Sequence, residues 1–146
     1  MYLLIDISEL NKIHLAIFDK KSVRQAQDKI EHKYYSGRNR KLLVCIDKMF
    51  KGIRSKEGSP LGKGGTGGLL SGIMVVVGTG SFTSTRIACV VANTFAFALH
   101  IPLLAIKQAE IDKVQELIPK LLKQKPGHYL SATYSGEPNL GNPKSN

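Results

Sequence analysis

The sequence predicts an α/β fold, a mixed five-stranded sheet with flanking helices, in the order β-β-β-α-β-α-β-α. Two observations favour this class. Short apolar runs rich in Val, Ile and Leu recur along the chain, which is typical of buried strands. Segments with apolar residues at helical spacing separate the later runs, whereas the first two runs are close enough to pair as a hairpin. This order gives a sheet with both antiparallel and parallel pairs.

Five strands are expected from apolar runs and alternation. The first is interrupted only by Asp6, and the second alternates apolar residues with His14 and Ala16. The third is polar and weakly alternating, as an edge strand would be, and the last two are short runs of aliphatic residues. The expected strands are residues 2–7, 13–17, 22–33, 73–77 and 103–106.

Three helices are expected from apolar residues at helical spacing, at residues 39–51, 84–99 and 111–122. The second is rich in alanine, and Pro102 prevents its continuation. Pro119 is expected to kink or split the third. Between the first helix and the fourth strand, residues 52–72 contain eight glycines and are expected to form a flexible loop.

A chain of 146 residues with ordinary apolar content predicts one domain. Residues 1–126 are expected to form a single lobe, and residues 127–146 an irregular tail. Cys45 and Cys89 fall on the apolar faces of predicted helices, which indicates buried thiols rather than a disulfide. The scattered histidines do not suggest a metal site.

The N-terminus enters an apolar run directly, without the basic leader of a signal peptide. The longest uncharged apolar stretch is interrupted by Asn93, His100 and Pro102, so no bilayer span is expected. We therefore expect a cytoplasmic protein without membrane contact.

The charge is strongly basic, with a formal net charge of +10. Residues 29–56 concentrate this excess, because nine basic residues there face only Glu31 and Asp47. Such a patch attracts nucleic acid or an acidic partner, although solubility alone is the alternative explanation. Tyrosines beside basic residues, among them Tyr34, are candidates for stacking on RNA bases or are plain surface residues.

The turn after the fourth expected strand is a candidate phosphate or nucleotide loop. Gly78 and Gly80 permit positive φ, which lets backbone N–H groups converge on an anion. Ser81, Thr83 or Ser84 would cap the next helix, whose positive dipole end also favours an anion. Asp6 is a candidate to face the same cleft, as a partner of a metal or of phosphate-bound water. The alternative is structural: a sharp reversal at the glycines and a buried acid bonded to its own turn.

Several segments together resemble one known family. They are LLIDIS (residues 3–8), NRKLLVCID (residues 39–47) and GIMVVVGTGSFTSTRIACVVANTFAFALHIPLLAI (residues 72–106), which ends in the strand IPLLAI. They are similar to the N-terminal lobe of the TsaB (YeaZ) family, whose signature usually reads Gly-Pro-Gly-Ser-Phe-Thr-Gly-Leu-Arg. Departures include Thr79 and Ser84, where the family has Pro and Gly, and Arg40, where it has Glu.

The resemblance implies a ribonuclease-H-like or actin-like lobe, here without the second lobe that completes a nucleotide cleft. TsaB proteins are not catalysts themselves. They pair with the catalytic paralogue TsaD, and a complex that includes an ATPase, here a TsaE-like protein, installs threonylcarbamoyl on adenosine 37 of tRNA. The resemblance therefore implies a non-enzymatic subunit that forms a homodimer and needs no cofactor, with ATP only as part of a complex. Its contact with tRNA would be indirect or through a basic patch.

In this family the first two helices pack against the partner as a small bundle. The repeat of Ala88, Ala92 and Ala96 agrees, because small side chains let another helix approach closely. Carried over to this chain, the interface residues are Arg40, Leu43, Ile46, Asp47, Phe50, Arg86, Ile87, Val90, Val91 and Thr94.

Two other functions remain open from the residues alone. A basic RNA-binding module would use residues 29–56 to contact phosphates directly. A small nucleotide hydrolase would use Asp6 and the turn at Gly78.

Overall fold

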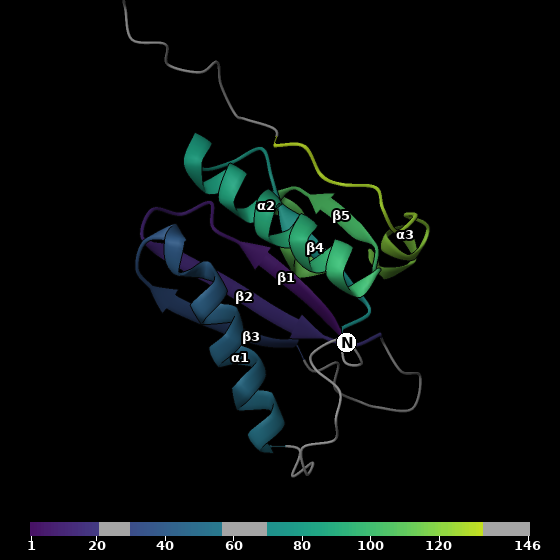
Figure 1. Ribbon diagram of the computed structural model, residues 1–146, viewed down its shortest axis with the longest axis horizontal. Helices are drawn as coiled ribbons and strands as arrows, with labels where there is room; N and C mark the ends of the chain where they lie inside the picture. The colour runs from purple at the N-terminus through teal and green to yellow at the C-terminus, as the bar shows by residue number, and fades with distance from the viewer. Residues whose placement is uncertain (21–29, 57–69, 133–146) are drawn as a thin grey trace, which may run out of the picture.

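The computed structural model describes residues 1–20, 30–56 and 70–132. Five strands form one sheet in the order β3-β2-β1-β4-β5 (Figure 1). β1 pairs antiparallel with β2 and parallel with β4, so the predicted mixed five-stranded α/β fold is confirmed. The strands are β1 Tyr2–Asp6, β2 Lys12–Phe18, β3 Ile30–Ser36, β4 Gly72–Val76 and β5 Leu103–Ile106.

Helices cover both faces of the sheet. The long helices α1 (Leu42–Lys56) and α2 (Phe82–Leu99) lie on the same face of the sheet (Figure 1). The short 3-10 helix η1 (Asn39–Lys41) leads into α1. The 3-10 helix η3 (Gln108–Lys113) and α3 (Ile118–Leu122) cover the other face.

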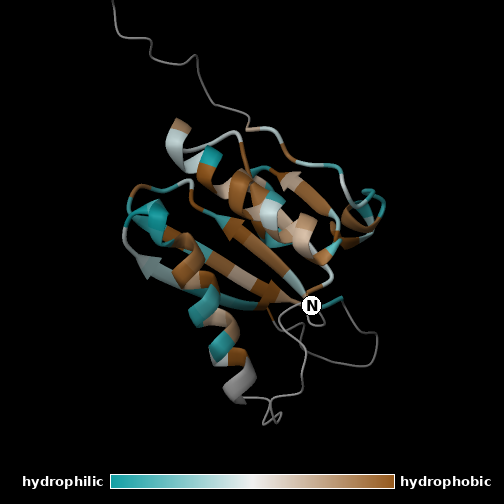
Figure 2. Cartoon of the chain, in the orientation of Figure 1, coloured by the Kyte–Doolittle hydropathy of each residue, from teal (hydrophilic) through white to brown (hydrophobic). Residues whose placement is uncertain are grey.

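The core has two parts because successive strand side chains point to opposite faces. Leu3 and Ile5 of β1 pack with Met49 of α1 and the buried side of α2. Leu4, between them, packs with Ile118 and other apolar residues on the α3 side. In Figure 2 the central strands are accordingly hydrophobic along their length.

The third strand lies later than the sequence predicts. β3 spans Ile30–Ser36 rather than residues 22–33, and residues 21–29 lie outside the described part of the chain. Its side chains alternate between partly buried and exposed, as expected of an edge strand. The adjacent Tyr34 and Tyr35 have high strand propensity, and this signal should have outweighed the weak polar alternation before residue 30.

The helices also differ from their expected limits. α1 continues past residue 51 through Gly52, which costs about 1 kcal/mol in a helix interior. Ile53 on its far side is buried in the core, and this packing offsets the cost. The third helix is split, as expected: η3 comes first, and α3 begins at Ile118 with Pro119 in its first turn. Residues 57–69 of the expected loop lie outside the described residues.

Both cysteines are buried thiols, as predicted. Burial raises the pKa of Cys45 and of Cys89. α2 is the one described helix that is long and apolar enough to cross a membrane, although a core helix meets the same criteria.

The alanines of α2 do not face a partner. Ala88, Ala92 and Ala96 are at most 2% exposed and belong to the core between α2 and the sheet. Their small side chains therefore let α2 approach the strands closely, which corrects the expectation that they receive a second helix.

After α3 the chain returns to α2. Asn93 Nδ2 donates a hydrogen bond to the Leu130 carbonyl oxygen at 2.9 Å, and the Leu130 N–H donates to Asn93 Oδ1 at 2.8 Å. The Leu130 side chain packs against the core of the α1–α2 face. The Asn93 side chain thus holds the last described segment against α2. Residues 133–146 of the expected tail lie outside the described residues.

Replacing Asn93 with alanine is expected to lower the free energy of unfolding by about 1–2 kcal/mol, because both hydrogen bonds to Leu130 are lost. Amide exchange at Leu130 should accelerate more than exchange in the β1–β4 pair. Asn93→Asp keeps only the acceptor, so its exchange rate at Leu130 should lie between those of the parent chain and Asn93→Ala. Unchanged exchange at Leu130 in both variants would show that the amide does not hold this segment.

Candidate functional site

The turn after β4 is shaped by close packing against the first hairpin. Gly78 and Gly80 both have positive φ, 82° and 93°. A Cβ atom on Gly80 would lie 2.8 Å from the Ser8 Cα and 2.9 Å from the Ser8 carbonyl oxygen, whereas one on Gly78 would meet nothing within 4 Å. Gly80 therefore lets the turn after β4 touch the backbone at Ser8. This favours the structural explanation of the glycine over a role in binding an anion.

The start of α2 is already capped by its own side chains. Ser81 Oγ accepts a hydrogen bond from the Ser84 N–H at 3.1 Å, and the Ser81 carbonyl oxygen accepts one from Thr85 Oγ1 at 3.1 Å. Asn39 Nδ2, from the start of the first helix, donates to Ser84 Oγ. The candidate Thr83 is exposed. Ser81 is thus engaged in the helix cap.

Asp6 is hydrogen-bonded to its own turn, as the structural alternative predicted. Its Oδ1 accepts hydrogen bonds from the Ser8 N–H at 3.0 Å and from Ser8 Oγ at 2.7 Å. Its Oδ2 lies 3.7 Å from Nδ1 of His14. Burial alone would raise the pKa of Asp6, but the nearby His14 and the hydrogen bonds from Ser8 outweigh it, so the pKa lies below its ordinary value.

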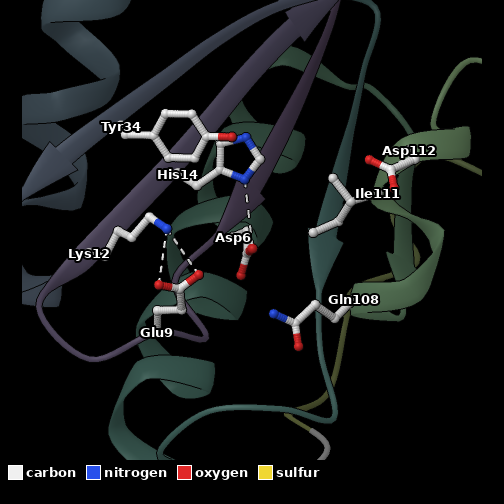
Figure 3. Close-up of a pocket in the computed structure, with 8 residues that line it drawn as sticks. All are labelled: Asp6, Glu9, Lys12, His14, Tyr34, Gln108, Ile111 and Asp112. Atoms are coloured by element: carbon white, nitrogen blue, oxygen red, sulfur yellow. Dashed lines mark hydrogen bonds and ion pairs between the residues drawn. The ribbon is translucent and has the colours of Figure 1, made fainter.

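Asp6 lines a cavity of about 220 Å³ at the carboxyl end of β1, on the α3 side of the sheet. Its walls come from the first hairpin, β2, β3 and η3; His14 points toward the Asp6 carboxylate, whereas Lys12 and Glu9 point toward one another (Figure 3). Lys12 bonds Glu9 at the rim, with both distances 3.0 Å. The lining residues are Asp6, Glu9, Lys12, His14, Tyr34, Gln108, Ile111 and Asp112.

The cavity and the glycine turn are separate places. None of Gly78, Gly80, Ser81 and Thr83 lines the cavity that holds Asp6. The cavity also carries three carboxylates against one lysine, which disfavours a phosphate. Among the described residues, no group of three His, Cys, Asp or Glu side chains is placed to hold a metal ion.

Two histidines beside the cavity form a pair that the sequence analysis missed. His14 Nε2 lies 3.0 Å from His32 Nδ1, and the His14 ring also stacks on Tyr34 at 4.5 Å between centroids. The register of β2 and β3 sets Ala16 opposite His32 and His14 opposite Tyr34, so the two histidines are diagonal neighbours on one face. Because the expected third strand ended at residue 33, this register was not available from the sequence.

His32 and Asp6 make the free energy of unfolding depend on pH. Burial and the nearby His14 lower the pKa of His32. A histidine with a lowered pKa in the folded state contributes stability that is present above its unfolded value of about 6.5 and is lost as the pH falls below it. The pKa of Asp6 in the folded state lies below its ordinary value of 3.8. The carboxylate therefore contributes stability that is lost as the pH falls through that lowered pKa.

We therefore expect the urea midpoint of unfolding to decrease between pH 7.5 and 5.5, and the decrease to be smaller in His32→Gln. The more distant His128→Gln, an exposed residue beyond α3, is the control and should follow the parent chain. An equal pH dependence in all three proteins would show that the His14–His32 pair does not contribute.

The residues expected at a partner interface divide into two groups. Arg40, Leu43, Asp47, Arg86, Val90 and Thr94 are exposed, and Ile87 is partly buried. Ile46, Phe50 and Val91 are at most 8% exposed and belong to the core, so a partner would not reach them in this conformation. The helical spacing that suggested these three residues arises because they face the sheet.

Three exposed apolar residues of the same helices, Val44, Phe82 and Phe97, were not among the expected residues. Val44 on α1 is 53% exposed and Phe97 on α2 is 74% exposed. The signal that would have found them is an apolar residue on the face opposite the core stripe.

No family model matches the sequence, and no curated protein matches it. Among solved structures, the fold is similar to YeaZ from Pseudomonas aeruginosa, with a TM-score of 0.54 and 21% identity, covering 82% of this chain and 50% of that one. It is also similar to an uncharacterized protein with similarity to peptidase YEAZ from Pseudomonas aeruginosa, with a TM-score of 0.50 and 23% identity, covering 73% of this chain and 42% of that one. The chain thus spans about half the length of these structures or less. At this identity the similarity shows the fold alone: the chain has a YeaZ-like α/β fold.

Proposed function

We propose that this chain is a non-catalytic docking subunit of the TsaB type, which pairs with a TsaD-like enzyme in the threonylcarbamoylation of adenosine 37 in tRNA. The observation that carries the proposal is a set of exposed apolar side chains on α1 and α2. Leu43 and Val44 of α1 are 55% and 53% exposed, and Val90 and Phe97 of α2 are 63% and 74% exposed. The two helices lie on the same face of the sheet (Figure 1).

These apolar residues have the surroundings expected of an interface. Exposed apolar side chains concentrated on one face of a small protein mark docking surfaces more often than isolated ones do. Polar groups border them: Asp47 pairs with Lys51 at 2.7 Å, and Arg86 lies 4.8 Å from the centroid of the Phe82 ring. An apolar centre with a polar rim is the usual anatomy of a protein–protein interface.

Several described residues outside the two helix faces support a non-catalytic role. Ser81 is engaged in capping α2, and Asp6 in bonding Ser8 and His14. The cavity beside Asp6 has an acidic lining, so it would repel the phosphates of a nucleotide. These features argue against the hydrolase alternative. In the proposal, a TsaE-like ATPase joins through the TsaD-like enzyme, and ATP binds only within that complex.

The proposal also gives the isolated chain a partner. A homodimer that packs α1 and α2 of two copies would cover the same apolar residues until the TsaD-like enzyme replaces one copy. Sedimentation at increasing protein concentration should therefore show a dimer that disappears when the enzyme is added.

Calorimetric titration of the chain into the TsaD-like enzyme of the same organism tests the proposal. We expect a one-to-one complex with a dissociation constant in the micromolar range or tighter. Absence of association at micromolar concentrations would contradict it.

A further inference from the structure

We infer that the edge formed by the starts of α1 and α2 binds the phosphate backbone of RNA, through Arg38, Arg40 and Lys41. We call these three residues the cationic edge. The inference rests on the proposed function only in the choice of tRNA as the RNA. It differs from the proposed function in the side chains used: the proposed partner contacts the exposed apolar residues of α1 and α2, whereas the RNA contacts the three cations that precede Leu43 and Val44.

The cationic edge is a local concentration of unneutralised charge. All three side chains are exposed, and no ion pair to any of them is found within the described ranges. Neither η1 nor α1 has an acidic residue in its first turn. Elsewhere in the basic segment, Lys33 pairs with Glu31 at 3.5 Å and Lys51 with Asp47. Among the described cations of this segment without an ion pair, Arg38, Arg40 and Lys41 lie together at the start of α1, whereas Lys48 lies apart from them along the helix.

A second helix start lies against the first. Asn39, inside the cationic edge, donates its Nδ2 hydrogen bond to Ser84 in the first turn of α2. That turn also has no acidic residue. The starts of two helices, each with a positive dipole end, therefore lie near three cations, an arrangement that would favour a bound anion.

The polar groups at this junction are incompletely paired. The side-chain oxygens Asn39 Oδ1 and Thr79 Oγ1 are buried, and neither has a hydrogen-bond partner in the described part of the chain. Thr79 belongs to the turn that precedes α2. Because both oxygens are buried, a phosphate outside the chain would not reach them, and the exposed cations would make the contact.

The chemistry favours a nucleic acid backbone over an acidic protein. Phosphates follow one another at regular intervals along RNA, and arginine forks bind phosphate oxygens with two hydrogen bonds. Two arginines within three residues, presented beside helix starts, suit such a repeated anion.

The test measures binding of the isolated chain to unmodified tRNA by fluorescence anisotropy from 50 to 200 mM salt, without any partner protein. The variant Arg38→Gln/Arg40→Gln/Lys41→Gln should bind at least about tenfold more weakly at 50 mM salt. Its slope of log affinity against log salt should be smaller by about two to three, since each lost phosphate contact removes about 0.7–0.9. The control Lys120→Gln/Lys123→Gln/Lys125→Gln removes the same charge from exposed residues in and just after α3.

The control triple should retain most of the affinity and slope. Equal losses in the two triples would overturn the inference, because binding would then follow net charge alone. Absence of tRNA binding by the parent chain at 50 mM salt would also overturn it. Unchanged tRNA binding together with lost association of the cationic-edge triple with the TsaD-like enzyme would assign this edge to an acidic protein instead, again overturning the inference. Calorimetry with the parent chain reports separately on the proposed function.

Discussion

Replacing Gly80 with alanine is expected to lower the free energy of unfolding by about 2–4 kcal/mol. Two costs add. The residue has φ of 93°, which a side chain rarely adopts, and its Cβ would lie 2.8 Å from the Ser8 backbone, which cannot move aside as a flexible side chain can. Urea unfolding monitored by far-ultraviolet circular dichroism measures the change.

Gly78→Ala is the matched control. It shares the positive φ of 82° but has open space around the added atom, so we expect a loss of about 1 kcal/mol. If the two variants lose equal stability, contact between the turn and the first hairpin is not what requires Gly80.

Val90→Arg is expected to weaken association with the TsaD-like enzyme by at least about 100-fold. A charge placed in the apolar centre of an interface must be desolvated on binding and has no arranged partner there. Val90 is 63% exposed, so the variant should fold normally, and its thermal midpoint should stay within about 2 °C of the parent. Calorimetric titration measures the affinity.

Leu122→Arg provides the comparison on the opposite face of the sheet. Leu122 is an exposed apolar residue of α3, 50% exposed, so the chemical change is similar. We expect it to leave association unchanged. Equal weakening by both substitutions, or no effect of Val90→Arg, would remove the α1–α2 face from the proposed interface.

The sheet could be predicted where burial dominates. β1, β2, β4 and β5 are apolar because they pack between helices or against a neighbouring strand, and their runs mark them directly. β3 is an edge strand whose position depends on register with β2, a non-local property that its polar sequence does not encode strongly.

The candidate site was harder to predict because its main contacts are long-range. The Gly-x-Gly pattern correctly located the turn before α2, but the need for Gly80 comes from Ser8, which is distant in sequence. Similarly, the pairing of His14 with His32 depends on the β2–β3 register. The buried positions of Ile46, Phe50 and Val91 show a further limit: helical spacing identifies an apolar stripe without saying whether the sheet or a partner covers it.

Hydrogen–deuterium exchange of the chain, alone and with the TsaD-like enzyme, tests the central claim most directly. The account predicts that binding slows exchange in both α1 and α2, around Leu43 and Val90. Exchange in α3 should stay unchanged. Protection confined to η3, α3 or the first hairpin, with α1 and α2 unaffected, would contradict it.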